Sequence, residues 1–395
     1  MTLKSILKID IRNKRVLLRI DINSPVVDGK ILDNPRFKAS CETIKYLIKK
    51  GAKVAILAHQ GRKGERDFLP LKEHSKLLSK YTGGKISYVD DLFGEKAIES
   101  IKNLKPKHAI MLANVRNYDD ELLIKKKQNG YIQLCNKFDI FVNDAFSVSH
   151  REQGSIIIPP KFLPSYMGLS IQKEISALDK SKIGRQSTIY LLGGEKIKDY
   201  FPIFNNLKNK RNKIIASGVL ANLLLVAKEF NLGYENKWLE EKGYIKLIPK
   251  LKSLCRKYKN QIILPVDFAI DDSGHRVEIS LNGFPNGSKI LDVGHESVRI
   301  FKKHFGKSKA IFMKGPLGFS EIDEFSYGTV EILKEISMIS KNKKVFSLIG
   351  GGHLTTTISK YKIPDNFSHI SLSGGALIAY ISGEKLPGLE ALKQK

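Results

Sequence analysis

The chain has 395 residues, of which 42% are hydrophobic and 27% charged, and its 67 basic and 40 acidic side chains give a formal net charge of +27. This length predicts two domains, each with its own core, and the balanced composition excludes a disordered or fibrous protein. No apolar run has the length of a membrane helix or of a secretory signal, so we expect a cytoplasmic protein.

Short apolar runs alternate with amphipathic segments in the first part of the chain. The runs lie at 16–20, 53–58, 109–113 and 138–142, and segments of helical period, such as 40–50, lie between them. This alternation is typical of strand, helix, strand units. It predicts an α/β fold with a parallel sheet.

The segment FLPSYMG at 162–168 predicts a domain boundary, because Pro164 and Gly168 flank a turn and LSIQKEISALDK follows as a connecting helix. We therefore expect one domain over 1–166 and another over 167–383. Further apolar runs at 188–192, 213–216, 261–266, 309–313, 345–349 and 369–372 predict a second sheet.

Polar side chains follow the apolar runs of the first domain. Ligands bind outside the carboxyl ends of parallel strands, so these positions form one candidate crevice. Guanidinium groups bind carboxylate and phosphate in a bidentate manner, which favours a small ligand that carries both groups. The crevice residues are Asp21, Asn23, Arg36, His59, Arg62, Asn114, Arg116, Asn143, Asp144, His150 and Arg151.

Glycines follow the apolar runs of the second domain instead. Glycine lets backbone N–H groups approach phosphate oxygens, and a helix that begins there adds partial positive charge. Neither GxxxxGK[ST] nor GxGxxG is present, so the pattern predicts a nucleotide phosphate site of another kind. The segments are GGEK at 193–196, SGV at 217–219, KGP at 314–316, GGGH at 350–353 and SGGA at 373–376.

Ordered motifs along almost the whole chain resemble those of the phosphoglycerate kinase family. They are RIDINSP at 19–25, AHQGR at 58–62, ANVR at 113–116, FVNDAFSVSHR at 141–151 and FLPSYMG, followed by LLGGEKI, KGPLG, SLIGGGH, HISLSGGA and GEKLPGLEALK. AHQGR and GGGH are most similar to the archaeal branch of the family.

The resemblance implies two Rossmann-like lobes, each a parallel sheet flanked by helices, joined by a long helix and a hinge. Residues 1–166 would bind 3-phosphoglycerate, with 384–395 packing back on this lobe, and residues 167–383 would bind the nucleotide. The implied reaction is reversible phosphoryl transfer between 1,3-bisphosphoglycerate with ADP and 3-phosphoglycerate with ATP, in glycolysis or gluconeogenesis. Mg²⁺ would accompany the nucleotide, and the chain would act as a monomer or homodimer.

The resemblance also implies roles for individual residues. Arg36 and Lys196 would be catalytic. The metal ligands remain unknown. The substrate set would be Asp21, Asn23, Arg36, His59, Gly61, Arg62, Arg116 and Arg151. The nucleotide set would be Gly193, Gly194, Lys196, Glu321, Gly350, Gly351, Gly352 and His353.

The chain departs from the family pattern mainly in the nucleotide half. Tyr200 stands where bacterial and eukaryotic members have a second lysine, Lys314 replaces an asparagine, and His353 replaces an acidic residue near the metal. Further departures are Leu372, Ser373 and Ala113.

Three functions remain open at this point. The first is an active kinase in which Lys314 supplies the charge missing at Tyr200. The second is an impaired relative that binds 3-phosphoglycerate, in a regulatory role, with an altered nucleotide site. The third is a basic nucleic-acid-binding protein, but the chain has no known binding module and its crevice arginines follow separate strands. We therefore expect small-molecule substrates as partners, and neither nucleic acid nor a membrane.

Overall fold

The computed structural model describes residues 3–342 and 345–393. The chain divides into two compact units, one from the N-terminus to Ser176 together with the segment from Glu384, and one from Ala177 to Gly383. The division lies inside helix α7 (Leu169–Ser181), later than the predicted boundary at 166. Residues 394 and 395 of the predicted C-terminal return lie outside the described residues. Across 3–342 and 345–393, no helix is long and apolar enough to cross a membrane.

The first unit is built on a six-stranded sheet in the order β5-β6-β4-β1-β7-β8, in which all neighbours are parallel. The inner strands β4 (Lys53–Leu57), β1 (Arg15–Ile20) and β7 (Ile140–Asp144) are almost entirely buried, which explains their continuous apolar runs. The outer strands are β5 (Ile86–Tyr88), β6 (Ala109–Met111) and β8 (Ser165–Met167).

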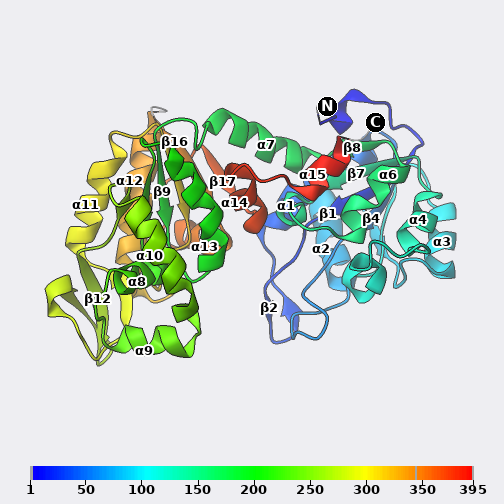
Figure 1. The fold of residues 1–395 in the computed structure, drawn as a ribbon. Coiled ribbons are helices and arrows are strands. Elements are labelled where there is room, and N and C mark those ends of the chain that lie inside the picture. The colour runs from blue at the N-terminus through cyan, green and yellow to red at the C-terminus, as the bar shows by residue number, and fades with distance from the viewer. Residues whose placement is uncertain (1–2, 343–344, 394–395) are drawn as a thin grey trace. The chain divides into compact units, whose positions relative to one another are not determined.

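Helices flank this sheet, as a parallel topology requires (Figure 1). Helix α1 (Pro35–Lys49) begins with Pro35 in its first turn, and the Asn34 side chain accepts a hydrogen bond from the Arg36 N–H. This cap fixes the backbone at Arg36. The unit also contains α2 (Lys72–Thr82), α3 (Glu95–Lys102), α4 (Gly130–Cys135), α5 (Gly154–Ile157), α6 (Pro159–Phe162) and the hairpin of β2 (Val26–Val27) and β3 (Lys30–Ile31).

The C-terminal helix α15 (Pro387–Leu392) packs against α5, α6 and β8 of the first unit. It lies beside β8 in Figure 1, although more than half of the chain separates the two segments. The Gly388 N–H donates to the Ser149 carbonyl at 2.8 Å. A Cβ at Gly388 would lie 2.7 Å from Ile156 Cγ2 and 3.0 Å from the Ser149 backbone, so glycine is required by close packing.

Gly388→Ala should therefore destabilise the first unit by about 1 to 3 kcal/mol, because the added methyl group has to push α15 away from Ser149. Urea unfolding checks this. Gly306→Ala is the matched control, since a Cβ at Gly306 meets nothing within 4 Å. Equal urea midpoints for the two variants would contradict the packing role of Gly388.

The second unit has its own six-stranded parallel sheet, in the order β11-β10-β9-β15-β16-β17. The strands are β11 (Ile262–Ile263), β10 (Lys213–Ala216), β9 (Thr188–Leu192), β15 (Ala310–Lys314), β16 (Phe346–Gly350) and β17 (His369–Ser371). The helices are η5 (Ile197–Lys208), α8 (Gly218–Ala227), α9 (Tyr234–Glu241), α10 (Ile248–Lys257), α11 (His295–Phe305), α12 (Tyr327–Lys341), α13 (Gly352–Lys360) and α14 (Gly375–Ile381).

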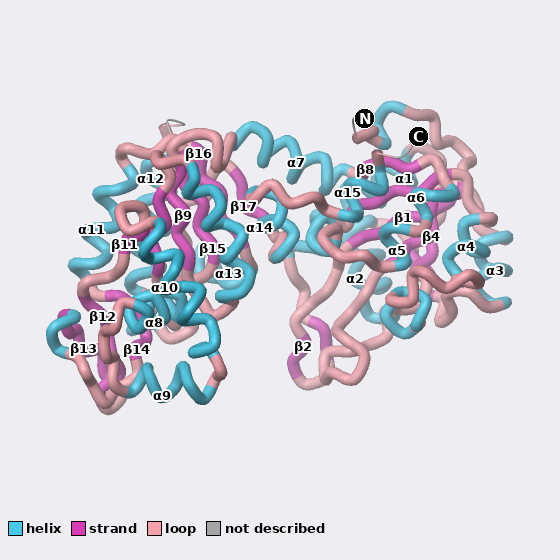
Figure 2. Tube along the Cα trace, in the orientation of Figure 1, coloured by secondary structure: helices cyan, strands magenta, loops and turns pink. Residues whose placement is uncertain are grey.

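A small antiparallel sheet, in the order β13-β12-β14, is added to this unit and was not predicted from the sequence. It consists of β12 (Asp267–Asp272), β13 (His275–Ser280) and β14 (Ile290–Val293). In Figure 2 it lies next to α9, apart from the strands of the large sheet. This sheet and α9 supply part of the wall of a cavity described below.

One sequence prediction about strands was wrong and another was correct only in part. The predicted strand at 261–266 is shortened to β11 (Ile262–Ile263), because Pro265 cannot donate to a sheet ladder. The segment 162–168, predicted to be a turn, contains the edge strand β8, in which Phe141 pairs with Ser165. Pro164 lies just before the strand, where its missing N–H costs nothing.

Candidate active site

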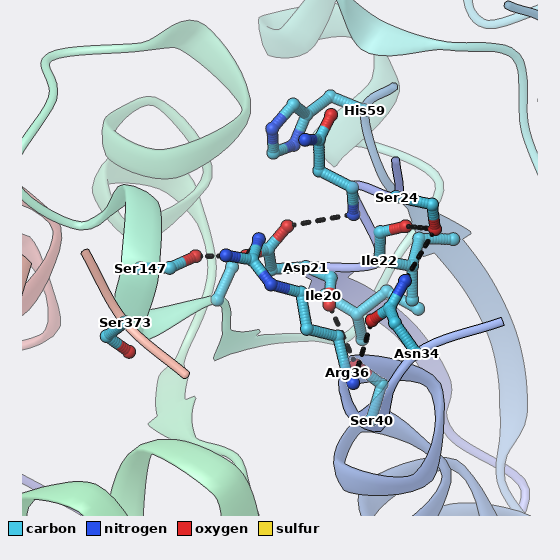
Figure 3. Close-up of polar contacts among 12 residues, drawn as sticks. Ile20, Asp21, Ile22, Ser24, Asn34, Arg36, Ser40, His59, Ser147 and Ser373 are labelled. Carbon is cyan, nitrogen blue, oxygen red and sulfur yellow. Dashed lines mark hydrogen bonds and ion pairs between the residues drawn. The ribbon is translucent and has the colours of Figure 1, made fainter. Parts of the chain in front are cut away.

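The first unit places its polar residues at the carboxyl ends of β1, β4 and β7, with Arg36 at the start of α1. Arg36 Nη1 lies 2.5 Å from Asp21 Oδ2, which also accepts a hydrogen bond from the Ser147 hydroxyl. Figure 3 shows Arg36 and Ser147 beside Asp21. Burial alone would raise the pKa of Asp21, but Arg36 and other partners outweigh it and hold the pKa well below its usual value. Asp21 is therefore a carboxylate that orients Arg36.

The loop after β4 is held in place by its neighbours. Asn23 Oδ1 accepts a hydrogen bond from the Gly61 N–H at 2.8 Å, and Arg116 Nη1 donates to the Gly61 carbonyl. Gly61 has a φ of +65°, and a Cβ there would lie 2.2 Å from the Asp67 carbonyl oxygen. Only glycine fits this turn. The structure therefore brings together Asn23, Gly61 and Arg116, as the sequence predicts.

Arg62, Arg116 and Arg151 form a further cationic group in this site. Burial and, after it, the neighbouring Arg151 lower the pKa of Arg116 to about 10. Burial also lowers the pKa of Arg151, with Arg62 as the second cause. Arg151 thus repels both Arg62 and Arg116, and an anion beside these guanidiniums would relieve the repulsion. His59 is buried against the same group and interacts electrostatically with Asp21, Arg36 and Arg116.

Other polar residues of the predicted crevice have structural partners. The Asn114 amide donates to the carbonyls of Gln60 and Leu69, and Asn143 Oδ1 accepts from the Ala145 N–H. Asp144 accepts hydrogen bonds from Ser170 and from the Ile171 N–H, and so caps the start of α7. Burial raises the pKa of Asp144 to about 6.

Sequence reasoning did not identify Arg19, Gln60 and Ser147 as parts of this site. Gln60 Oε1 accepts from the Ser24 N–H and the His74 ring, and its amide donates to the carbonyls of Ser24 and Asp67. Arg19 is completely buried and contacts His59. An arginine inside the apolar run VLLRI was a signal that could have pointed to it.

The second unit contains a cavity of about 180 Å³ near the ends of β9, β10 and β15. The base of the cavity is mainly apolar, with Phe268 and Leu317, while Glu321 and His353 lie at its exposed rim. His353 Nδ1 is 3.7 Å from Glu321 Oε1, so the structure brings these two predicted residues together. Gly194 and Trp238 also line the cavity.

The glycines at these strand ends differ in their surroundings. A Cβ at Gly193 would lie 2.1 Å from the Pro316 carbonyl oxygen, and one at Gly350 would lie 2.9 Å from Leu377. At these two positions, close packing is itself a reason for glycine. Gly351, with a φ of +113°, and Gly352 face open space, and Gly352 begins α13 with no side-chain cap. A helix N-terminus of this kind offers unpaired N–H groups to an anion.

A buried lysine lies between these glycine turns. Lys314 is the last residue of β15, and its backbone is in register with Leu192 of β9 and Gly350 of β16. The side chain is 7% exposed and makes no hydrogen bond or ion pair with any residue in 3–342 or 345–393. Burial lowers the pKa of Lys314 to about 8. Asp199 opposes this shift and Lys196 adds to it.

Tyr200 is also buried, and its hydroxyl donates to the Gly193 carbonyl at 2.5 Å, with the Lys314 carbonyl oxygen at 3.3 Å. Burial raises the pKa of Tyr200 well above its usual value, so the hydroxyl stays neutral. This residue therefore joins the ends of β9 and β15 and contributes no positive charge. Lys196 is exposed at the start of η5, and Lys314 lies within electrostatic range of it.

An arginine-rich anion site, a cavity edged by glycine turns and a buried lysine beside it indicate an enzyme that acts on phosphorylated small molecules. Comparison with known proteins specifies the class. The family model "Phosphoglycerate kinase" matches residues 6–384.

Two curated relatives are similar over nearly their whole length. Phosphoglycerate kinase 2 of Methanosarcina acetivorans is 40% identical over 100% of this chain and 96% of its own, and phosphoglycerate kinase of Methanothermus fervidus is 40% identical over 98% and 95%. The crystal structure of phosphoglycerate kinase from Pyrococcus horikoshii superposes with a TM-score of 0.91 at 35% identity, covering 99% of this chain and 98% of the other.

The chain belongs to the phosphoglycerate kinase family. It is a phosphoryl-transferring enzyme of glycolysis with ATP and ADP as nucleotide substrates, as the archaeal-type motifs predict. The nucleic-acid-binding alternative finds no support in these comparisons.

Proposed function

We propose that the first unit binds 3-phosphoglycerate and that the chain transfers a phosphoryl group reversibly between its carboxylate and MgATP. The observation that carries this proposal is the group of three guanidiniums in which Arg151 repels both Arg62 and Arg116, together with the fixed pair of Asp21 and Arg36. A phosphate dianion would satisfy the three guanidiniums, and Arg36 would lie near the carboxylate end.

The substrate supplies its own nucleophile, because a carboxylate is already ionised at neutral pH. The protein therefore has no proton to remove. It contributes position and positive charge, which are the main requirements of phosphoryl transfer. Arg36 in one unit and Lys196 in the other are the proposed catalytic cations, and Asn23, His59 and Gly61 complete the substrate set.

For the nucleotide, we propose that the base occupies the cavity and that the phosphates lie near Gly194, Gly351, Gly352 and Lys196. Glu321 and His353 at the rim would face the sugar and the phosphates. The support is the open space at Gly351 and Gly352, the bare N-terminus of α13 and the nearby lysines.

No group of three or more His, Cys, Asp and Glu side chains in the described part of the chain is arranged to hold a metal ion. The residues therefore do not form a protein cage for Mg²⁺. Mg²⁺ commonly binds through phosphate oxygens, waters and one or two carboxylates, and we propose that it enters with the nucleotide. When bound, it would neutralise phosphate charge.

The test is a coupled assay for ATP-dependent formation of 1,3-bisphosphoglycerate from 3-phosphoglycerate. Turnover that requires both substrates supports the proposal. Binding of 3-phosphoglycerate without any turnover would instead support the impaired relative. Glycerate is the control substrate, because it keeps the carboxylate but lacks the phosphate that the three guanidiniums would bind.

Trp238 offers a separate test of the nucleotide position. It is the single tryptophan of the chain and lines the cavity. ADP should change its fluorescence, because a base in the cavity would displace water beside the indole. Trp238→Phe should lose the signal but retain turnover. An unchanged emission at ADP concentrations that saturate turnover would contradict the placement of the base.

A further inference from the structure

His59 lies against an arginine that fixes the state of its ring. Arg19 Nη2 is 3.1 Å from His59 Nδ1, and both side chains are buried. A guanidinium can donate hydrogen bonds but cannot accept them, and it stays protonated in proteins. His59 Nδ1 must therefore be the acceptor, which leaves the proton of the neutral ring on Nε2. His59 Nε2 makes no hydrogen bond with another residue in the described part of the chain.

Arg19 is itself held firmly by a buried chain of hydrogen bonds. Arg19 Nε donates to Ser155 Oγ at 2.9 Å, and Nη1 donates to the Ile20 carbonyl. The Ser155 hydroxyl in turn donates to Glu121 Oε1 at 2.8 Å. Glu121 Oε2 accepts from the Ser155 N–H and the Tyr131 hydroxyl, each at 2.8 Å. Glu121, Ser155 and Tyr131 are all buried.

This network connects a carboxylate to His59 through Ser155 and Arg19, without a direct ion pair between Arg19 and Glu121. The negative charge of Glu121 partly offsets the cost of burying the guanidinium. Because every link is buried and paired, the guanidinium cannot easily turn away from the ring.

The charges around His59 act in the same direction. Burial lowers the pKa of His59 well below its usual value, and Arg19, Arg116 and Arg36 lower it further. Asp21 alone among its charged neighbours raises it. A histidine with a lowered pKa is charged only below that pKa, so the ring is neutral at and above neutral pH.

We propose that Arg19 is a positioning residue that fixes His59 as a neutral imidazole with its proton on Nε2, so that His59 offers the anionic substrate a hydrogen-bond donor and not a charge. The part that concerns substrate rests on the proposed function of the site. The part that concerns Arg19 and the ring applies to the free enzyme. The anion site would then contain two kinds of group. The guanidiniums supply positive charge, and His59 supplies a neutral hydrogen-bond donor.

The direct test is the ¹⁵N NMR spectrum of the histidine rings in the free enzyme, with His59→Gln used to assign the signal. We expect His59 to show a protonated Nε2, a bare Nδ1 and no titration between about pH 6 and pH 8, where an unperturbed histidine titrates. A protonated Nδ1, or a midpoint in this range, would overturn the proposal.

Arg19→Gln tests the cause. Glutamine offers either an oxygen or an N–H to Nδ1, so both tautomers should appear and the His59 pKa should rise toward its usual value. The ratio of variant to wild-type KM for 3-phosphoglycerate should then rise up to roughly tenfold from pH 6 to pH 8, as the variant loses the charge of His59 and has no fixed donor. The substrate ionises in the same way in both assays, so its own effect on KM cancels in this ratio. An unchanged tautomer in Arg19→Gln would contradict the role of Arg19.

Arg12→Gln is the matched control, because Arg12 is an exposed arginine just before the same strand. It should leave the His59 spectrum and KM unchanged. If Arg19→Gln does not fold, the wild-type spectrum still tests the tautomer of His59. Ser155→Ala, which removes one acceptor of Arg19, should then shift the His59 signals in the direction expected for Arg19→Gln. An expected tautomer whose signals do not move on addition of 3-phosphoglycerate would support the role of Arg19 but contradict the substrate role of His59.

Discussion

Arg36→Ala should abolish measurable turnover, a loss of at least about 4 kcal/mol in transition-state stabilisation, which is at the upper end for one preorganised charge contact. The reason is that Asp21 holds the Arg36 guanidinium while the Asn34 cap fixes the Arg36 backbone. Another side chain at this position therefore cannot place a cation at the same point. Steady-state kinetics with 3-phosphoglycerate and ATP would measure kcat.

The fold should remain intact in this variant. Arg36 is partly exposed, and Asp21 keeps its hydrogen bonds from Ser147 and the Asn23 N–H. Lys38→Ala is the matched control, because it removes an exposed cation from the same turn of α1. Near-normal kcat in Arg36→Ala, or equal losses in the two variants, would refute a catalytic role for Arg36.

Lys314→Asn should lower kcat by an amount that corresponds to a rise of about 2 to 4 kcal/mol in the activation free energy. The reason is that it removes a buried cation from the glycine turns where the nucleotide phosphates are proposed to lie. Asparagine is the residue that the wider family pattern has at this position. The variant should still bind ADP, as measured by Trp238 fluorescence, if the base provides most of the binding.

The pKa of Lys314, about 8, also predicts that the reaction depends on pH. The charge is present below this pKa and disappears as pH rises through it, so kcat/KM for ATP should fall above pH 8 in the wild type. Lys314→Asn should lack this decrease. Lys309→Asn, at an exposed position just before the same strand, is the control. An identical pH profile in wild type and Lys314→Asn would show that Lys314 does not contribute charge to the reaction.

Tyr200→Lys gives a complementary result. The Tyr200 hydroxyl joins Gly193 to Lys314, so lysine at this position replaces a structural contact by a second ammonium. In the background of Lys314→Asn, partial recovery of kcat would show that the two positions can exchange the charge. A double variant no faster than Lys314→Asn would show that they cannot.

The large sheets were predictable from the sequence because buried parallel strands carry continuous apolar runs, as in β9 and β15. The small sheet was not. Strand β13 has no buried residue and no apolar run, and β12 has only the three apolar residues 268–270 before it ends in acidic residues. Edge strands of three residues, such as β5, are too short to show a period.

The position of the candidate site was also predictable, because parallel topology places strand ends at one edge. The partners of each residue were not. Glu121, Ser155 and Arg19 are far apart in the sequence and meet only after folding. Likewise, Gly193 and Gly351 look alike in sequence, but one is packed against Pro316 and the other faces open space. Local sequence cannot distinguish these two reasons for glycine.

The return of α15 to the first unit has a consequence for synthesis of the chain. The second unit is one continuous segment, from Ala177 to Gly383, whereas the first needs residues from both ends of the chain. Proteins are made from the N-terminus and domains tend to fold as they emerge from the ribosome. The second unit can therefore complete its fold while the first, although made earlier, still lacks its last helix. Its β8 edge and the surface around Ser149 stay uncovered until α15 has been made, and chaperone protection of this unit would matter up to that point.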